Sequence, residues 1–219
     1  MNLQIDIPAA FRWASSREDW WRPYLILGAC TFIPLVGPFV HFGWQRRAFD
    51  AARAGDPVPD PEPLTDLGAG FKLLVGLAIS QMILIVPFFL LLTLPVVALL
   101  IAAQQADPDV QPFYVLAAGL LNLMMFLPLI PVIVIQQELM RRELKGQFIA
   151  ALRLGAVFST IRRHAVEYVT IMLGAWLGQL VAGFGWFLCF VGMFFTLPFS
   201  FAVNCHLLAQ FDKRVGEEA

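Results

Sequence analysis

The chain has 219 residues, of which 59% are hydrophobic and 14% charged, and its formal net charge is −1. Soluble domains contain roughly 45–50% apolar and about 25% charged residues, and a fold of this size has too small an interior to hide the surplus. The composition therefore excludes an ordinary soluble domain and predicts an all-α integral membrane protein surrounded by the lipid bilayer. Because its basic residues form only local clusters, the chain is not expected to bind nucleic acid.

The first predicted element, 1–22, is an aromatic-rich segment. It lacks the basic start, continuous apolar core and cleavage site of a signal peptide, so we expect it to be retained. Tryptophan side chains favour the boundary between lipid and water, and this segment contains Phe11, Trp13, Trp20 and Trp21. We therefore expect an amphipathic segment resting at the cytoplasmic interface.

The apolar segment 23–44 is interrupted by Pro34, Gly37 and Pro38. Arginines flank it on both sides, and basic residues next to membrane segments stay in the cytoplasm. This distribution favours a re-entrant hairpin, broken at these three residues and covered by neighbouring helices. A single spanning helix is the alternative. The acidic, Pro-rich stretch 45–70 follows as a cytoplasmic linker, either a solvated connection or a tether for a partner.

Residues 71–137 are predicted to form a first transmembrane hairpin. One uncharged run extends from Leu73 to Gln105, and a second covers 113–135 after the polar break 106–112. About 20 residues cross the hydrocarbon core at 1.5 Å per residue, so the longer run must tilt, bend or protrude. The expected bends are at Pro87, Pro95, Pro128 and Pro131.

The stretch 138–166 combines basic residues with an apolar face. Phe148, Ile149, Leu152 and Ala156 recur at helical spacing. This pattern predicts one amphipathic helix lying in the cytoplasmic interface. A soluble linker helix is the alternative.

Residues 167–211 are predicted to form a second hairpin that turns at the glycine-rich stretch 183–186. Basic residues gather in 138–166 and in the tail 212–219, whereas the turns of both hairpins carry none. The distribution places these turns outside and both termini in the cytoplasm. We therefore expect four full spans plus the broken segment, with five spans as the alternative.

Five landmarks in the first third of the chain carry a resemblance to a known family. They are Trp20 and Trp21, the I-P-x-x-G pattern at 33–37, the basic stretch 46–53, the acidic Pro-rich stretch 56–66 and the G-x-K pattern at 70–72. In this order they resemble the bacterial and archaeal membrane proteins grouped as domain of unknown function 4013. The resemblance implies a multi-pass protein in the cytoplasmic (inner) membrane of a prokaryote. The family brings no established activity.

Candidate functional residues are the polar side chains at membrane depth. The predicted spans contain no Asp, Glu, Lys or Arg, which argues against a charge-coupled transporter. Gln81, Asn122, Asn204 and His206 are the candidates for a polar or substrate path. Hydrogen bonding to a neighbouring helix is the alternative role for each of them.

No cofactor or metal is expected. Cys30, Cys189 and Cys205 lie in apolar runs, and the three histidines make no metal site of recognisable spacing. We find no motif of a hydrolase, metalloprotease or nucleotide-binding loop, and no nucleophile and base at membrane depth. The chain is therefore not expected to be an enzyme.

Two kinds of function remain open. The first is a non-enzymatic structural or accessory subunit of a membrane assembly, with another membrane protein or a second copy as its partner. The Gly174 and Gly178 pair can serve such an association, or packing within its own hairpin. The second is a small channel, permease or lipid-handling transporter that uses the broken segment 23–44.

Overall fold

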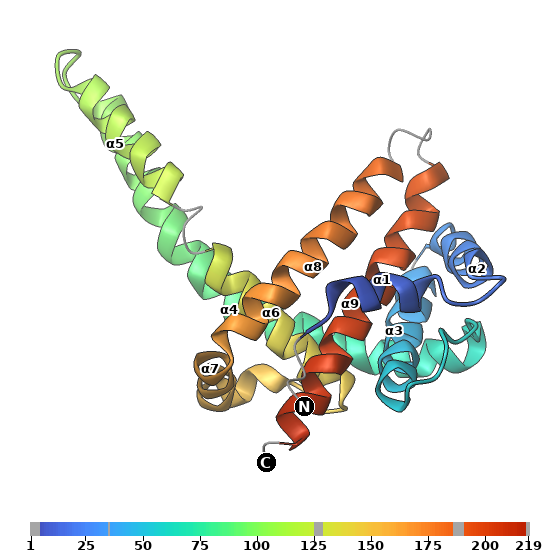
Figure 1. The fold of residues 1–219 in the computed structure, drawn as a ribbon. Helices are drawn as coiled ribbons and strands as arrows, with labels where there is room; N and C mark the ends of the chain where they lie inside the picture. The colour runs from blue at the N-terminus through green and yellow to red at the C-terminus, as the bar shows by residue number, and fades with distance from the viewer. Residues whose placement is uncertain (1–4, 35, 125–128, 186–190, 218–219) are drawn as a thin grey trace.

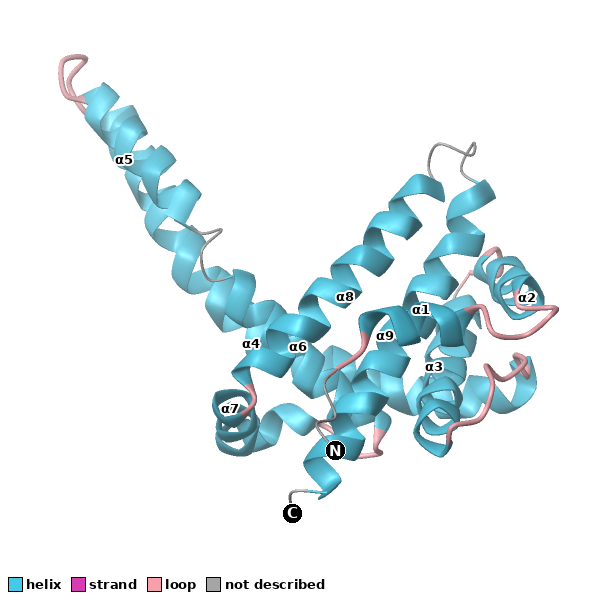
Figure 2. Ribbon diagram, in the orientation of Figure 1, coloured by secondary structure: helices cyan, strands magenta, loops and turns pink. Residues whose placement is uncertain are grey.

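The computed structural model describes residues 5–34, 36–124, 129–185 and 191–217. Within these ranges every regular element is a helix and there is no strand (Figures 1 and 2). The prediction of an all-helical chain is confirmed. The helices form a body near the two termini and a long arm that projects away from it (Figure 1).

Helix α9 (Val191–Glu217) is the centre of the body. It packs against α1 (Ile7–Ala14), α2 (Trp21–Thr31), α3 (Val36–Ala54) and α8 (Ala165–Phe184). Large side chains buried in the body are Tyr24, Trp44, Phe49, Tyr168, Leu207 and Phe211. The last helix of the chain therefore holds together elements from both halves of the sequence.

The arm consists of α4 (Pro63–Gln105) and α5 (Gln111–Met124), which pack side by side (Figure 1). Helix α4 starts with a proline, whose missing N–H does no harm in the first turn. The carboxylate of Asp66 accepts a hydrogen bond of 2.8 Å from the backbone N–H of Glu62, which closes this helix start. The first part of α4 packs on α3 in the body, and its second part enters the arm.

Among the described residues, three helical stretches are long and apolar enough to cross a membrane: Pro63–Gln105, Ala165–Phe184 and Gly192–Gly216. The predicted run 113–135 contains α5, which is apolar but shorter, and then passes through 125–128, outside the described residues. Pro128, Cys189 and the end of the turn predicted at 183–186 also lie outside them. Helix α4 continues through both of its internal prolines, Pro87 and Pro95.

The stretch 138–166, expected to form one interfacial helix, is divided into several pieces. Helix α6 (Leu129–Leu144) ends in a turn, and the 3-10 helix η1 (Ala150–Arg153) and α7 (Leu154–Arg163) follow. The turn has two residues in the left-handed region, Gly146 at φ 84° and Ile149 at φ 54°. The apolar spacing through Phe148 and Ile149 therefore does not reflect a continuous helix, because the backbone reverses there.

Helices α3 and α4 cross at van der Waals contact because glycines remove the side chains at the crossing. A Cβ atom on Gly70 would lie 1.6 Å from the carbonyl oxygen of Phe39, and one on Gly43 would lie 2.0 Å from that of Asp66. Any larger residue forces the two backbones apart. These glycines therefore determine where the residues that follow them on each helix come together.

The Gly174 and Gly178 pair packs within the body. A Cβ atom on Gly174 would lie 2.6 Å from the side chain of Leu207, and one on Gly178 would lie 3.5 Å from Ser200, both on α9. The two glycines thus allow α8 and α9 to approach each other. This surface is occupied within the chain, which favours the packing alternative over dimerisation through this pair.

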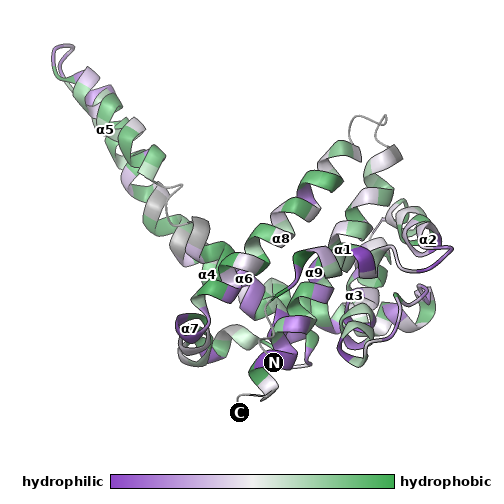
Figure 3. Cartoon of the chain, viewed as in Figure 1, coloured by the Kyte–Doolittle hydropathy of each residue, from purple (hydrophilic) through white to green (hydrophobic). Residues whose placement is uncertain are grey.

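Hydrophobic and hydrophilic residues occupy different parts of the molecule. Most of the arm and much of α8 are hydrophobic, whereas hydrophilic residues gather around α7 and the C-terminal end of α9 (Figure 3). An apolar region bounded by a polar end is the distribution expected of helices that enter a bilayer from one side.

Candidate functional site

The segment 23–44 is divided into two helices in the structure. Helix α2 ends at Thr31, Pro34 lies in the connection, and Gly37 and Pro38 lie in the first turns of α3. The connection is tight because a Cβ atom on Gly37 would lie 2.6 Å from the carbonyl oxygen of Cys30. At 1.5 Å per residue, the 11 residues of α2 extend about 16 Å, roughly half of a hydrocarbon core.

Hydrogen bonds from His41 join the two halves of this broken segment. The Nε2 atom of His41 lies 2.8 Å from Oγ1 of Thr31 and 3.0 Å from the carbonyl oxygen of Leu27. Large apolar residues are nevertheless exposed near the connection, with Phe32 66% and Ile33 50% exposed. The broken segment is therefore a pair of helices joined by hydrogen bonds, and its tip presents an apolar surface.

The acidic linker lies against the body. The guanidinium of Arg47 in α3 binds the carboxylate of Asp66 through two hydrogen bonds of 2.7 Å, and it also contacts Glu62 at 3.0 Å. The indole N–H groups of Trp13 and Trp44 donate to backbone carbonyls of the linker. These contacts favour a docked connection over a free tether for a partner.

A buried network of charges joins α6, α8 and α9. Arg141 donates two hydrogen bonds, of 2.7 and 2.8 Å, to the carboxylate of Glu138 one turn earlier in α6. Arg141 also donates to Asp212 in α9, and the hydroxyl of Tyr168 in α8 donates to Glu138. Glu138 is fully buried and Asp212 is 2% exposed, so these charges are stable in the interior only because they are paired.

Asp212 is the meeting point of three cations. Besides Arg141, it contacts Arg53 of α3 at 3.1 Å and Lys145 in the turn after α6 at 3.0 Å. The ring of the adjacent Phe211 lies 5.3 Å from the guanidinium carbon of Arg141, within cation–π range. Asp212 therefore ties the end of α9 to α3 and to the turn after α6.

The network keeps its central residues charged at neutral pH. Burial alone would raise the pKa of Glu138, but the hydrogen bond and charge of Arg141, with bonds from Tyr168 and Arg142, lower it below the ordinary value. Burial would lower the pKa of Arg141, and the nearby carboxylates, Glu138 above all, raise it instead. A proton donor or acceptor for catalysis needs a pKa nearer the working pH, so these shifts fit a structural role.

A second buried carboxylate, Glu143, joins α4 to the segment after α6. Its Oε1 atom accepts hydrogen bonds from the hydroxyl of Ser80 at 3.0 Å and from the backbone N–H of Ala150 at 2.8 Å. A Cβ atom on Gly76 of α4 would lie 2.4 Å from the Oε2 atom of Glu143. Glu143 is thus packed tightly against α4 while it holds the start of η1.

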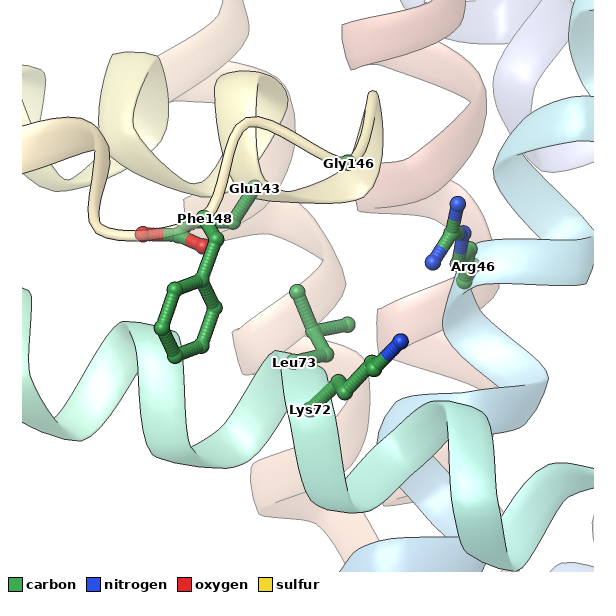
Figure 4. Close-up of a pocket in the computed structure, with 6 residues that line it drawn as sticks. All are labelled: Arg46, Lys72, Leu73, Glu143, Gly146 and Phe148. Atoms are coloured by element: carbon green, nitrogen blue, oxygen red, sulfur yellow. The ribbon is translucent and has the colours of Figure 1, made fainter.

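Next to Glu143 lies a cavity of about 440 Å³ between α3, α4 and the turn after α6. Its lining residues are Arg46, Lys72, Leu73, Glu143, Gly146 and Phe148. The side chains of Arg46 and Lys72 lie on one side of the cavity, and Glu143 and Phe148 lie on the other (Figure 4). Among the described residues, neither Arg46 nor Lys72 has an acidic oxygen within 4.0 Å.

The four polar residues predicted at membrane depth do not form one site. Gln81 in α4 accepts a hydrogen bond of 3.2 Å from the side chain of Gln136 in α6. Asn122 is exposed on α5, and its side chain has no hydrogen bond within the part of the chain that is described. Both are absent from the lining of the cavity at Arg46 and Lys72.

The other two predicted residues lie on α9. The Oδ1 atom of Asn204 is buried without a hydrogen-bond partner among the described residues. The ring of His206 stacks on that of Trp13, with centroids 5.0 Å apart, and its Nδ1 atom lies 3.0 Å from the side-chain nitrogen of Gln210. Gln210 in turn exchanges hydrogen bonds of 2.8 and 3.0 Å with the backbone of Asp6, so His206 and Gln210 hold α1 against α9.

Sequence reasoning missed the charge network and the cavity. Glu138, Arg141 and Lys145 belong to the stretch 138–166, for which the sequence predicts an interfacial helix with its charges on the surface. The available signal was Asp212, a carboxylate that comes shortly after the uncharged run 168–210 and needs a cation close by if it is buried.

The described residues are all-helical and include three helices long and apolar enough to cross a bilayer, a pattern typical of helical membrane proteins. Within that class, the chain belongs to the family described as protein of unknown function (DUF4013), whose model matches residues 26–191. The matched region contains the break at Pro34, Gly37 and Pro38, the α3–α4 crossing and every residue that lines the cavity. Searches of curated proteins and of solved structures found no match.

Proposed function

We propose that this chain is a non-enzymatic multi-pass membrane protein that acts as a structural subunit, and that its arm associates with the arm of a second copy. The main observation in support of the proposal is the exposed apolar surface of the arm. In the most apolar 18-residue stretch of α4, 7% of the described side chains are buried within the chain, against 33% in the corresponding stretch of α8 and 50% in that of α9. The arm has no comparable support from the body.

One face of α5 has the features of a helix contact inside a membrane. Val115, Gly119 and Asn122 follow one another at spacings of four and three residues, which places them on one face. A Cβ atom on Gly119 would have no neighbour within 4 Å, so another helix has room to approach. Close approach at small residues and hydrogen bonds from Asn are two main sources of helix association in lipid.

The position of Asn122 favours a second copy as the partner. Asn122 lies about 16 Å along the helix from Gln111, near the middle of a core about 30 Å thick. An amide there is costly to leave without a hydrogen bond. Because an amide both donates and accepts, two Asn122 side chains related by a two-fold axis satisfy each other.

The same proposal includes a topology. The two hairpins cross the cytoplasmic membrane, α2 and α3 enter and leave it on the cytoplasmic side, and both termini are cytoplasmic. The short α2 and the exposed apolar tip at Phe32 and Ile33 support re-entry, because α2 alone is too short to span. The buried acidic residues serve ion pairs between helices, which supports a structural role over a catalytic one.

The alternative of a channel or permease has less support. The side chain of Gln81 accepts a hydrogen bond from Gln136, and Asn122 is exposed on the arm. The cavity beside Glu143 reaches neither of them. A substrate path along the predicted polar residues would need a connection that their positions do not provide.

Disulfide cross-linking in membranes tests the proposed association. In a cysteine-free background, Asn122→Cys is expected to form a disulfide-linked dimer on mild oxidation. Leu120→Cys is the matched control, since it is exposed at similar depth but lies about 200° around the helix. Equal cross-linking of both variants, or of neither, would contradict a contact through Asn122. Cross-linking to a different protein would replace the second copy as the partner.

A quantitative measurement complements the cross-linking. Asn122→Leu removes the amide and keeps the helix apolar, so the dimer is expected to dissociate about three- to fivefold more readily, consistent with about 1 kcal/mol for such a hydrogen bond. The measurement is the monomer–dimer equilibrium in detergent by analytical ultracentrifugation. An unchanged equilibrium would show that the amide does not contribute.

A further inference from the structure

We infer that the cavity between α3, α4 and the turn after α6 is a binding site for a phosphate group, held by Arg46 and Lys72. The inference does not rest on the arm contact, which lies on other residues. It begins from the α3–α4 crossing, where Gly43 and Gly70 bring the backbones together. Arg46 comes one turn after Gly43, and Lys72 two residues after Gly70, so the crossing brings two cations to the same cavity (Figure 4).

The two cations have no acidic partner at ion-pair distance. Three other basic residues in this part of the molecule are paired with carboxylates: Arg47 with Asp66, and Arg141 and Lys145 with Asp212. Within the described residues, Arg46 and Lys72 make no such pair. Two like charges facing one cavity repel each other, and an anion between them removes that cost.

The carboxylates near the cavity do not take the place of this anion. Glu143 lines the cavity, but its Oε1 atom accepts from Ser80 and Ala150, and its carboxylate points away from the two cations (Figure 4). Asp50 lies one turn beyond Arg46 in α3. Burial raises the pKa of Asp50 despite the opposing charges of Arg46 and Arg53, and among the described residues its carboxylate forms no ion pair with Arg46.

The cavity has room for the anion because the chain turns at Gly146. The φ of Gly146 is 84°, and a Cβ atom there would lie 3.3 Å from the guanidinium nitrogen of Arg46. Glycine therefore permits the turn and leaves the guanidinium accessible. A volume of about 440 Å³ is within the usual range for small-molecule sites.

Phosphate is the anion that this combination fits. The planar guanidinium of Arg46 matches two phosphate oxygens, and the ammonium of Lys72 supplies a compact charge beside it. The lining also includes an exposed apolar side chain, Phe148, which is 57% exposed. Basic pockets between membrane helices bind the headgroups of anionic lipids. The phosphate can belong to such a lipid or to a soluble phosphate compound, and a separate experiment tests each source.

The test for a lipid uses the full chain in nanodiscs of equimolar phosphatidylcholine and phosphatidylglycerol. After transfer to mild detergent, native mass spectrometry counts the lipids that stay bound. The wild type is expected to retain phosphatidylglycerol over phosphatidylcholine. Lys72→Gln is expected to weaken this retention about fivefold, and Arg46→Gln with Lys72→Gln about 25-fold, since each cation contributes about one such factor.

Matched variants separate the site from general surface charge. Arg162→Gln with Lys213→Gln removes the same charge from exposed positions outside the cavity, and retention is expected to be unchanged. The double variant Arg46→Lys with Lys72→Arg preserves both charges, so it is expected to retain most of the phosphatidylglycerol that the wild type retains. Because Lys72 is exposed, Lys72→Gln is expected to leave the thermal unfolding midpoint unchanged, so a loss of retention in this variant reports binding and not misfolding.

The test for a soluble phosphate compound is a calorimetric titration of inorganic phosphate into delipidated protein, for the wild type and for Lys72→Gln. Phosphate binding that depends on Lys72, without selective retention of phosphatidylglycerol, assigns the site to a soluble phosphate compound. Retention of phosphatidylglycerol that depends on Lys72 assigns it to a lipid. If neither ligand depends on Arg46 and Lys72, or if the control pair causes the same loss, the inference is overturned.

Discussion

Arg141 of α6 donates a hydrogen bond to Asp212 of α9, 71 residues further along the chain. The pair lies in the interior, with Arg141 4% and Asp212 2% exposed. It joins the helix that follows the arm to the central helix of the body. The contact therefore makes the position of the arm depend on the end of the chain.

Asp212→Asn is expected to destabilise the protein by about 3–5 kcal/mol, because it leaves buried cations without their counter-charge. The measurement is the free energy of unfolding in detergent. Glu62→Gln is the control, since its partner Arg47 keeps Asp66 and the Glu62 side chain is 61% exposed. Loss of an exposed pair is worth about 1 kcal/mol or less. Equal effects of the two variants would show that Asp212 does not carry the network.

Stability is expected to fall in acid because of Glu138. Its pKa is lower in the folded protein than the ordinary 4.5, since the bonds and charge of Arg141 outweigh burial. A lowered folded-state pKa gives a stabilisation that is complete above the unfolded-state pKa and is lost as the pH falls through the folded-state value. The midpoint of thermal unfolding should therefore drop below about pH 4.5.

Glu138→Gln is the companion variant for this pH dependence. It is expected to be less stable than the wild type at pH 7. It is also expected to lose less stability as the pH falls below about 5, because the Glu138 carboxyl that titrates in the wild type is absent. The measurement is again the unfolding midpoint at each pH. A variant that keeps the full acid loss would assign that loss to other carboxylates.

Two alanine substitutions in α4 test the helix crossing. Gly70→Ala is expected to destabilise the protein, since its Cβ would lie 1.6 Å from the carbonyl oxygen of Phe39 and the backbones must separate. Gly68→Ala, two residues earlier in the same helix, meets nothing within 4 Å and is expected to stabilise α4 by about 0.5–1 kcal/mol. Unfolding in detergent measures both. A stabilising Gly70→Ala would contradict the close crossing.

The topology is testable by labelling single cysteines from outside intact cells, in a cysteine-free background. The positions are Ser15, Ala54, Asp107 and Glu217. We expect labelling at Asp107 alone, because the other three lie on the cytoplasmic side in the proposed arrangement. Labelling at Ser15 as well would show that 23–44 crosses the membrane once, which contradicts re-entry.

The sequence predicted the apolar parts of this fold best. Uncharged runs such as Leu73–Gln105 must be helical in lipid, where every backbone group needs a partner within the segment. The helix break at Pro34 could also be predicted from the sequence, since proline and glycine disturb a helix locally. These features depend on neighbours in the chain, and the sequence contains all of that information.

The interior of the polar end was not predictable in the same way. Glu138 and Arg141 look like solvated charges at the end of a helix, and only the approach of Tyr168 and Asp212 buries them. The turn at Gly146 was missed for a related reason, because the apolar spacing of Phe148 and Ile149 matches a helix. Pairings between distant segments decide both features, and a linear pattern does not report them.

The contact between α1 and α9 has a consequence for how the protein is made. Asp6 and Gln210 are 204 residues apart, and Trp13 rests on His206 close to the same point. A ribosome delivers the first segment long before the last one exists. The segment with Asp6 and Trp13 therefore cannot dock on α9 until the residues around Gln210 have been synthesised, so this docking is among the last steps of folding.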